Sequence, residues 1–121
     1  IPPFNFDKMA MTQAILNLLD NAMKFSREKK EIDIDLKRQD GKAVIRITDQ
    51  GIGINSREIN RIFEPFYRGS DITQGAGIGL ALVKHIAEAH GGKVTVESKV
   101  NRGSTFAIWL PIQGDSNVIK S

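Results

Sequence analysis

Four short blocks of the chain contain residue types whose spacing suits a nucleotide-binding site. One block offers two side-chain amides on a helix as metal ligands, and a second offers a carboxylate that can read a base. A third offers aromatic residues that can anchor a lid, and the fourth is a glycine-rich loop that can cradle phosphates. The blocks occupy residues 17–24, 49–53, 63–68 and 75–80, in that order. None is specific alone, but the four together predict a nucleotide site.

The first block places Asn17 and Asn21 four residues apart, so that on a helix both amides share one face. An amide oxygen is a neutral, hard ligand, suited to Mg²⁺ that keeps several waters and takes its charge balance from phosphates. The alternative is a helix with two solvent-facing asparagines, which the poor helix propensity of asparagine disfavours. Lys24 lies one turn further along and is either a phosphate ligand or an ordinary surface lysine.

In the second block, Asp49 closes an apolar segment and is followed by Gly51 and Gly53. Glycine at these positions permits positive φ and lets a ligand lie against the main chain. A carboxylate in such a pocket accepts a hydrogen bond from the exocyclic amine of adenine, which guanine does not offer at the same position. Taken alone, Asp49 is more simply explained as a turn aspartate in a glycine-rich loop.

The fourth block contains Gly75, Gly77 and Gly79 just before an apolar helical pattern. Main-chain N–H groups at a helix N-terminus, joined by a glycine loop, form a ready anion site. The block is not a P-loop, because no Gly-Lys-Ser/Thr ends it. It is also not the dinucleotide fingerprint, which requires glycine where Leu80 stands. An uncommitted flexible loop would have a similar composition.

The third block holds Phe63, Phe66 and Tyr67, which are expected to anchor a loop to the core. Arg68 follows them, and a guanidinium at the edge of a lid can reach a terminal phosphate. Neither histidine of the chain lies near a metal cluster, and a charge–dipole contact at a helix end is sufficient to explain His90. We therefore assign the histidines no catalytic role.

The elements that position these blocks follow from hydrophobic spacing. Asp7 is predicted to cap a helix that continues to about residue 26. Asn55 with Glu58 predicts a capping box and a short helix that Pro65 limits, and residues 66–77 predict a mobile loop. The remaining apolar patterns predict strands over residues 32–36, 44–48, 94–98 and 105–110, and a helix over residues 78–89. This order predicts an α/β two-layer sandwich with a largely antiparallel sheet.

The composition fits one small domain. With 121 residues, 40% of them hydrophobic, we expect a domain over residues 1–113 and a frayed tail over residues 114–121. The net charge is +3 with both signs mixed, and the basic cluster within residues 24–30 is interpreted as a solvated helix end rather than a nucleic-acid surface. The chain has no cysteine, and no apolar run reaches the roughly 18 residues of a membrane span. Because it begins without methionine, we expect a cytoplasmic piece of a longer protein whose other parts can include a membrane anchor.

Taken together, the four blocks resemble the N, G1, F and G2 boxes in the ATP-binding catalytic domain of sensor histidine kinases. The resemblance covers residues 4–111, in which residues 103–106 (Gly-Ser-Thr-Phe) resemble the last strand motif and residues 110–111 (Leu-Pro) the usual family ending. It implies a Bergerat ATP-binding fold, in which a mixed five-stranded sheet packs on about three helices and a flexible lid covers ATP.

The resemblance also implies a role for each position of the site. Asn21 would be the main Mg²⁺ ligand with Asn17 assisting, and Asp49 would read adenine. Lys24 and Arg68 would hold phosphate and, with Asn17, make up the catalytic set. The other implied cofactor-binding positions border the base, support the phosphates, hinge the lid or lie on the last strand: Phe25, Gly51, Gly53, Gly75, Gly77, Ile78, Gly79, Leu80 and Thr105.

The chain departs from the family pattern in two respects. Ala76 stands where the family often has threonine or serine, so that a hydroxyl contact to phosphate is lacking. The domain that carries the phosphoaccepting histidine, a dimerising helical hairpin, is outside this sequence. Gyrase-type and chaperone ATPases of the same fold have a water-activating glutamate one turn before the metal asparagine. Here that position is Asn17, which cannot act as a base.

The resemblance therefore implies transfer of the γ-phosphate of Mg–ATP to a histidine on that separate dimerisation domain, and then signalling through a response regulator. We expect the isolated domain to be a monomer, its parent a homodimer, and neither to need nucleic acid as a partner. Three alternatives remain open: an ATP hydrolase or ATP-driven switch, a serine kinase of the anti-sigma type, and a non-enzymatic nucleotide sensor.

Overall fold

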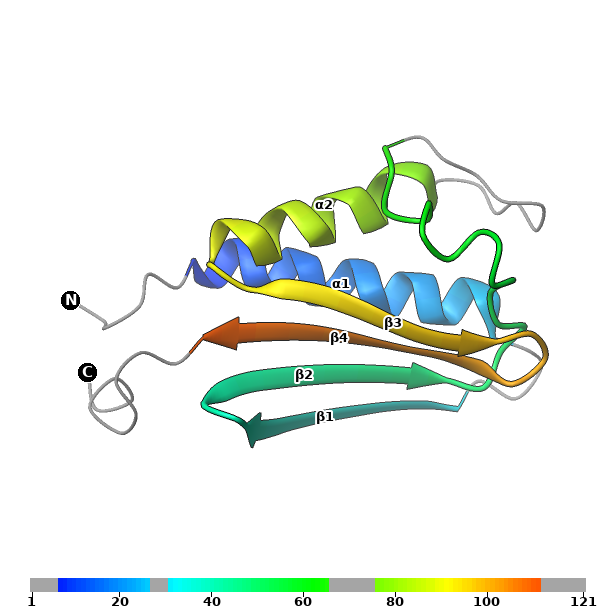
Figure 1. Cartoon of the computed structure of the whole chain (residues 1–121), viewed down its shortest axis with the longest axis horizontal. Coiled ribbons are helices and arrows are strands. Elements are labelled where there is room, and N and C mark those ends of the chain that lie inside the picture. The colour runs from blue at the N-terminus through cyan, green and yellow to red at the C-terminus, as the bar shows by residue number, and fades with distance from the viewer. Residues whose placement is uncertain (1–6, 27–30, 66–75, 112–121) are drawn as a thin grey trace.

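The computed structural model describes residues 7–26, 31–65 and 76–111, with only the main chain of residues 76–78. The described residues form one sheet and two helices. Figure 1 shows that the helices lie against one face of the sheet. The chain order is α1 (Lys8–Phe25), β1 (Ile32–Gln39), β2 (Lys42–Asp49), α2 (Ala76–Ala89), β3 (Lys93–Lys99) and β4 (Gly103–Pro111). This arrangement is the two-layer sandwich that the sequence predicted.

The four strands are ordered β1-β2-β4-β3, and every neighbouring pair is antiparallel. The counts implied by the family resemblance, five strands in a mixed sheet and about three helices, exceed the four strands and two helices of the described ranges. The tight turn at Asp40–Gly41 fixes the β1–β2 register, in which Ile47 pairs with Ile34. On its other side, Ile47 pairs with Phe106 of β4. The side chains that alternate with these three therefore lie on the opposite face of the sheet.

Helix α1 begins where the sequence predicted it. The Asp7 side chain accepts a hydrogen bond from the N–H of Ala10, at 3.0 Å, and so satisfies a donor that the first turn leaves free. Met11, Leu18 and Ala22 recur at helical spacing and are buried against the sheet.

Helix α2 ends at Ala89, as predicted, and Gly91 and Gly92 follow it. The N–H of Gly92 donates to Ala87 O at 2.9 Å, and Gly91 has φ +77°, the left-handed conformation that glycine adopts at little cost. The imidazole of His90 then links the two helices, because Nδ1 bonds Ile86 O at 2.8 Å and Nε2 accepts the N–H of Asp7 at 2.9 Å. His90 thus holds the start of α1 against the end of α2.

The short helix predicted after Asn55 is wrong. Residues 55–65 instead form successive turns, in which Glu58, Arg61 and Glu64 each donate to a carbonyl three residues earlier. The Asn55 side chain accepts from Arg57 N at 2.8 Å, two residues on, which is the local bond of an asparagine turn.

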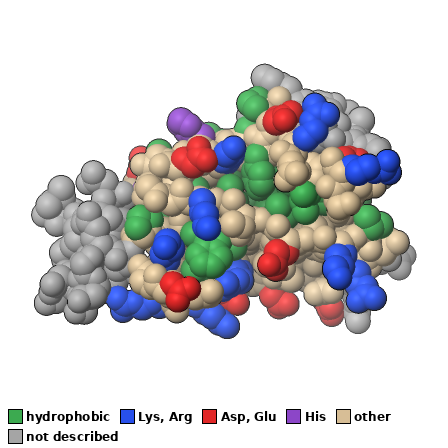
Figure 2. All heavy atoms as spheres, viewed as in Figure 1, with side chains coloured by type: hydrophobic (Ala, Val, Ile, Leu, Met, Phe, Trp, Pro, Cys, Tyr) green, Lys and Arg blue, Asp and Glu red, His purple; other side chains and the backbone are tan. Residues whose placement is uncertain are grey.

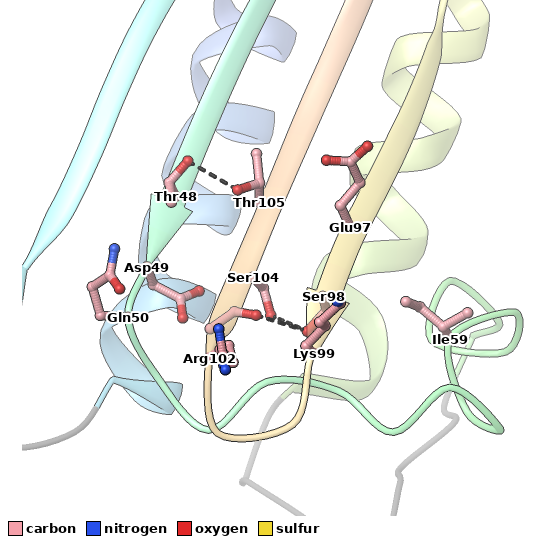
Figure 3. A pocket seen from close by; sticks show the side chains of 11 residues that line it. Thr48, Asp49, Gln50, Ile59, Glu97, Ser98, Lys99, Arg102, Ser104 and Thr105 are labelled. Carbon is pink, nitrogen blue, oxygen red and sulfur yellow. Dashed lines mark hydrogen bonds between the residues drawn. The ribbon is translucent and has the colours of Figure 1, made fainter.

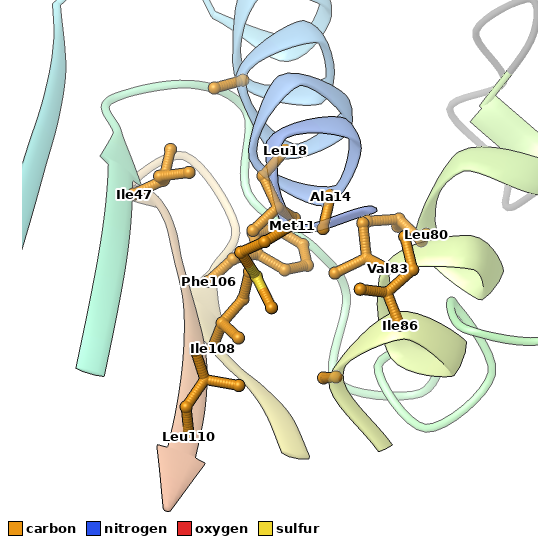
Figure 4. Packing of buried hydrophobic residues seen from close by; sticks show 12 residues of the cluster. Met11, Ala14, Leu18, Ile47, Leu80, Val83, Ile86, Phe106, Ile108 and Leu110 are labelled. Carbon is orange, nitrogen blue, oxygen red and sulfur yellow. The ribbon is translucent and has the colours of Figure 1, made fainter. Parts of the chain in front are cut away.

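The core lies between the helices and the sheet (Figure 4). Val83 and Ile86 of α2 meet Phe106 and Ile108 of β4 in one buried cluster, which also contains the buried face of α1. Phe63 packs edge-on against Phe106, with ring centroids 6.2 Å apart. As predicted, this aromatic residue anchors its segment to the sheet.

Gly41 and Gly103 both have positive φ, but a Cβ would meet other atoms only at Gly103. Substitutions at the two positions therefore distinguish the cost of backbone strain from the cost of a steric clash. Gly103 has φ +96°, and a Cβ there would collide with Asp49 O, whereas Gly41 has φ +74° and nothing within 4 Å. We expect Gly41→Ala to lower the free energy of unfolding by about 1 kcal/mol, and Gly103→Ala by about 3 kcal/mol or more. Urea titration of both variants measures the difference. Equal losses would show that Asp49 O does not crowd Gly103.

Candidate functional site

The amide side chains predicted as metal ligands, Asn17 and Asn21, lie on one face of α1. Asn21 is buried, with 8% of its surface exposed, and Asn17 is half-buried. Asn17 Nδ2 donates to Gly79 O, at 3.4 Å, in the first turn of α2, and Asn17 Oδ1 accepts from Gln13 Nε2 at 2.9 Å. The structure therefore brings the first and fourth sequence blocks together.

Lys24, one turn further along α1, pairs with Asp20, with 3.1 Å between its Nζ and the carboxylate Oδ2. This exposed pair at i and i+4 is sufficient to explain a surface lysine. Arg68 and Gly75 lie outside the described residues. For Gly77 and Ile78 the structure gives only the main chain, as part of α2.

The side chain of Leu80 is 8% exposed and belongs to the hydrophobic core. Any role of Leu80 in the site falls to its main chain, as the family resemblance implies.

Asp49 lies at the end of β2 and is 3% exposed, although it is ionisable. Its Oδ1 accepts the N–H of Gly51 at 2.8 Å. Burial raises the pKa of the Asp49 carboxyl, while hydrogen bonds from the main chain of Gly51 and Ser104 oppose that rise. A carboxyl that is this buried, with no ion pair among the described residues, is a candidate functional group.

The glycines after Asp49 are required by contacts between main-chain segments. A Cβ on Gly51 would collide with Phe25 O, and a Cβ on Gly53 would collide with Lys99 O. The sequence interpretation, that a ligand approaches these glycines, therefore does not explain them, because the protein itself occupies the space beside each Cα.

The loop over residues 51–54 is fastened at three points. Ile52 N donates to Phe25 O at 3.1 Å, and Ile52 O accepts from Asn101 N at 2.7 Å. Ile54 N donates to Ser98 Oγ at 2.7 Å. These bonds join the end of α1, the loop and the β3–β4 turn, so that Phe25 and Asp49 are held near one another.

The structure does not bring Thr105 to the buried face of Asp49. Strand register pairs Asp49 with Ser104 and Thr48 with Thr105. Because side chains alternate between faces, Thr105 lies on the face away from the helices, where its hydroxyl is 3.1 Å from that of Thr48 (Figure 3). The position beside Asp49 belongs to Ser104, which is 7% exposed.

Sequence reasoning missed Ser104 and the hydroxyl chain that holds it. Ser104 Oγ is 2.8 Å from Ser98 Oγ, which also donates to Gly103 O at 3.0 Å. Counting back from Phe106, which is buried, places Ser104 on the same face as Phe106. That alternation was the available signal.

The donor set of the described residues fits Mg²⁺ only as a partner of bound phosphate. Within residues 7–26, 31–65 and 76–111, no three acidic, histidine or cysteine side chains are grouped to hold a metal ion. The amide oxygen of Asn21 is a suitable neutral ligand, but it cannot balance the charge of a divalent ion.

Comparison with known proteins identifies similar domains. The family model described as "Histidine kinase-, DNA gyrase B-, and HSP90-like ATPase" matches residues 6–114. The circadian input-output histidine kinase CikA of Synechococcus elongatus is 37% identical over 91% of this chain, and the sensor-like histidine kinase SenX3 of Mycobacterium tuberculosis is 40% identical over 87%. The chain spans only 15% and 27% of the lengths of these relatives.

Solved structures agree with the sequence relatives. The solved chain of the mycobacterial sensor histidine kinase MprB superposes with a TM-score of 0.80 at 34% identity, over 89% of this chain and 76% of that solved chain. Full-length ShkA in complex with AMPPNP superposes with a TM-score of 0.76 at 31% identity, over 92% of this chain and 23% of ShkA. In the described part of the chain, no helix is long and apolar enough to cross a membrane.

The buried carboxyl of Asp49 should leave a signature in the pH dependence of stability. Because its pKa is raised in the folded state, ionised Asp49 lowers the free energy of unfolding at neutral pH. This loss of stability decreases as the pH falls through the raised pKa of the folded state. It is absent below the ordinary pKa of 3.8, where the carboxyl is protonated in both the folded and the unfolded state. We expect Asp49→Asn to be more stable than the parent at neutral pH, with a gain that shrinks on acidification. Chemical unfolding across pH measures it, and a gain independent of pH would contradict the assignment.

Proposed function

Because this chain belongs to the family of histidine kinase-, DNA gyrase B- and HSP90-like ATPases, we propose that it binds Mg–ATP and donates the γ-phosphate to a histidine on a separate domain. The activity is that of the catalytic domain of a sensor histidine kinase. The curated relatives are histidine kinases, and their names support a role in two-component signalling.

The observation that carries the proposal is the environment of Asp49. A carboxylate has about four lone-pair positions that can accept hydrogen bonds. The carboxylate of Asp49 accepts hydrogen bonds from the main chain of Gly51 and Ser104 and is almost fully buried. A further N–H donor would offset the cost of burying the charge. The exocyclic amine of adenine is such a donor, and Phe25 at the end of α1 lies close enough in the fold to border the base.

The phosphates are assigned to the space between α1 and the start of α2. The first turn of α2 presents main-chain N–H groups and the positive end of the helix dipole, both of which favour phosphate oxygens. Mg²⁺, when bound, neutralises phosphate charge and orients the γ-phosphate. Asn21 is its main protein ligand, since the oxygen of Asn17 already accepts from Gln13.

Phosphoryl transfer is favoured over hydrolysis because α1 offers no base at the relevant position. Asn17 stands where hydrolysing relatives of this fold have glutamate, and one turn earlier Gln13 is bonded to it. Neither amide can accept a proton from water at neutral pH. The domain therefore contributes position and charge neutralisation, and the attacking imidazole belongs to the partner.

Partners and further residues follow from the same proposal. The phosphoacceptor domain of the parent protein docks where the γ-phosphate is exposed, and a response regulator receives the phosphate from it. Arg68 and Lys24 contact phosphate. Lys24 does so by leaving its salt bridge with Asp20. The isolated domain is a monomer on the cytoplasmic side, the parent is a homodimer, and nucleic acid is not a partner.

Replacing Asp49 by asparagine should separate nucleotide affinity from folding. We expect Asp49→Asn to weaken ATP binding by about 1.5–3 kcal/mol, the scale of one hydrogen bond to a charged group, while the free domain stays folded. Calorimetric titration with ATP and Mg²⁺ measures the loss. Asp33→Asn, an exposed carboxylate on β1, is the matched control and should bind ATP like the parent. Unchanged affinity in Asp49→Asn would remove Asp49 from the site.

The transfer step can be tested with the parent segment that carries the histidine hairpin. Mixed with this domain and γ-labelled Mg–ATP, the hairpin should acquire label that is acid-labile and stable to alkali, as expected of phosphohistidine. Free phosphate without labelled protein would favour an ATP hydrolase. Acid-stable label would indicate a serine kinase, and bound ATP with neither product would indicate a nucleotide sensor.

A further inference from the structure

The face of the sheet opposite the helices carries an organised surface that the proposed function does not use. Both helices pack on the other face, so that in the described structure no helix covers this one (Figure 1). Residues that alternate with the core-facing positions point outward on this face of the sheet. The strand register aligns these outward side chains in rows that run across the strands. One row is Lys37, Val44, Trp109 and Lys93, from four different strands.

Trp109 is the fixed centre of this surface. Its Nε1 donates to Thr95 Oγ1 at 2.9 Å, which orients the indole on the sheet. Arg46 Cζ lies 5.6 Å and Lys93 Nζ 5.3 Å from the ring centroid, both within the range of cation–π contact. Figure 2 shows this face of the molecule, with basic side chains gathered around an apolar one.

Asp35 is the cross-strand neighbour of Arg46 and contributes one negative charge beside the two cations at the ring. Arg46 Nη2 bonds the side-chain amide of Gln39, at 3.0 Å, and neither Arg46 nor Lys93 forms an ion pair in the described part of the chain. By alternation, Lys37 and Lys42 lie on the same face and add two more positive charges. The field over Trp109 therefore favours an anionic group.

The opposite end of the same face is acidic. Asp33 on β1 and Glu97 on β3 point outward in the row of Thr48 and Thr105, and Asp35 lies in the adjacent row, opposite Arg46. A hollow of about 540 Å³ opens at this end, and it is lined by Thr48, Thr105 and Glu97 and also by Asp49 and Ser104 (Figure 3). The face thus has a basic, aromatic half and an acidic, hollowed half.

We propose that this outer sheet face docks an acidic segment of a protein partner, with carboxylates at Arg46 and Lys93 and an apolar side chain on Trp109. Tryptophan and arginine in such pairs are the residues that most often dominate binding energy at protein interfaces. A nucleic acid or an anionic membrane is disfavoured, because its uniform negative charge would meet Asp33, Asp35 and Glu97. A protein segment can match both halves of the face.

Trp109 is the only tryptophan of the chain, so its fluorescence reports on this surface alone. The probe is a short peptide that alternates glutamate with serine around one central leucine, titrated without nucleotide. We expect a saturable shift in Trp109 emission that weakens as salt is raised. The same peptide with glutamine in place of glutamate is the matched control and should give no saturable shift.

The variant Arg46→Gln/Lys93→Gln should bind the acidic peptide about tenfold more weakly, equivalent to about 1.4 kcal/mol. Asp35→Asn should bind it slightly more tightly, because one repulsive charge is removed. Asp49→Asn should bind it like the parent even where ATP binding is lost, which separates this surface from the nucleotide site. Circular dichroism verifies that each variant is folded.

Three outcomes would overturn the proposal. The acidic and glutamine peptides could give the same response, or the double variant could bind like the parent. An oligonucleotide or an anionic phospholipid vesicle could also saturate the Trp109 signal more tightly than the peptide, which would assign the surface to a different class of ligand.

Discussion

The meeting of three main-chain segments near the end of β2 is the constraint on which the rest of the site depends. Gly51, Gly53 and Gly103 each lie where a Cβ would collide with a carbonyl of another segment. Only glycine permits an approach this close, and two of the three also need positive φ. The approach fixes the end of α1 against the loop that follows Asp49. Since Asn21 is on α1 and Asp49 is on the sheet, this contact sets the distance between the side chains that we propose as metal ligand and as base-reading group.

Strand register is the second determinant, because it assigns each residue of β2 and β4 to one of two environments. Asp49 and Ser104 face the helices, while their neighbours Thr48 and Thr105 face outward and bond each other. A shift of register by one residue would exchange these roles and bury the wrong hydroxyl. Register also places Asp49 and Trp109 on opposite faces of the sheet, so that the two sites that we propose use different side chains of β2 and β4.

Much of the fold was predictable from periodicity. The N-cap at Asp7, the end of α2 before Gly91 and the antiparallel strand pairs follow from local chemistry. The turns over residues 55–65 were not predictable, because Asn55 can cap a helix or bond locally and only tertiary context decides. The outer surface was invisible because its members come from four strands and meet only once register is known. Which hydroxyl of β4 faces inward could not be predicted for the same reason, because the family motif names a strand but not the direction of its side chains.

Asp49 also explains why the nucleotide site is open to stabilisation by its ligand. In the free domain its carboxyl is buried and the pKa is raised, so the ionised form is held at a cost to stability. The same carboxylate accepts the N–H of Gly51, the residue packed against Phe25 O. A ligand that donates to Asp49 therefore lowers the cost of the buried charge and strengthens the junction between loop and helix at once. Binding and folding are coupled through one side chain, which is why a residue that destabilises the free domain can be retained at the centre of the site.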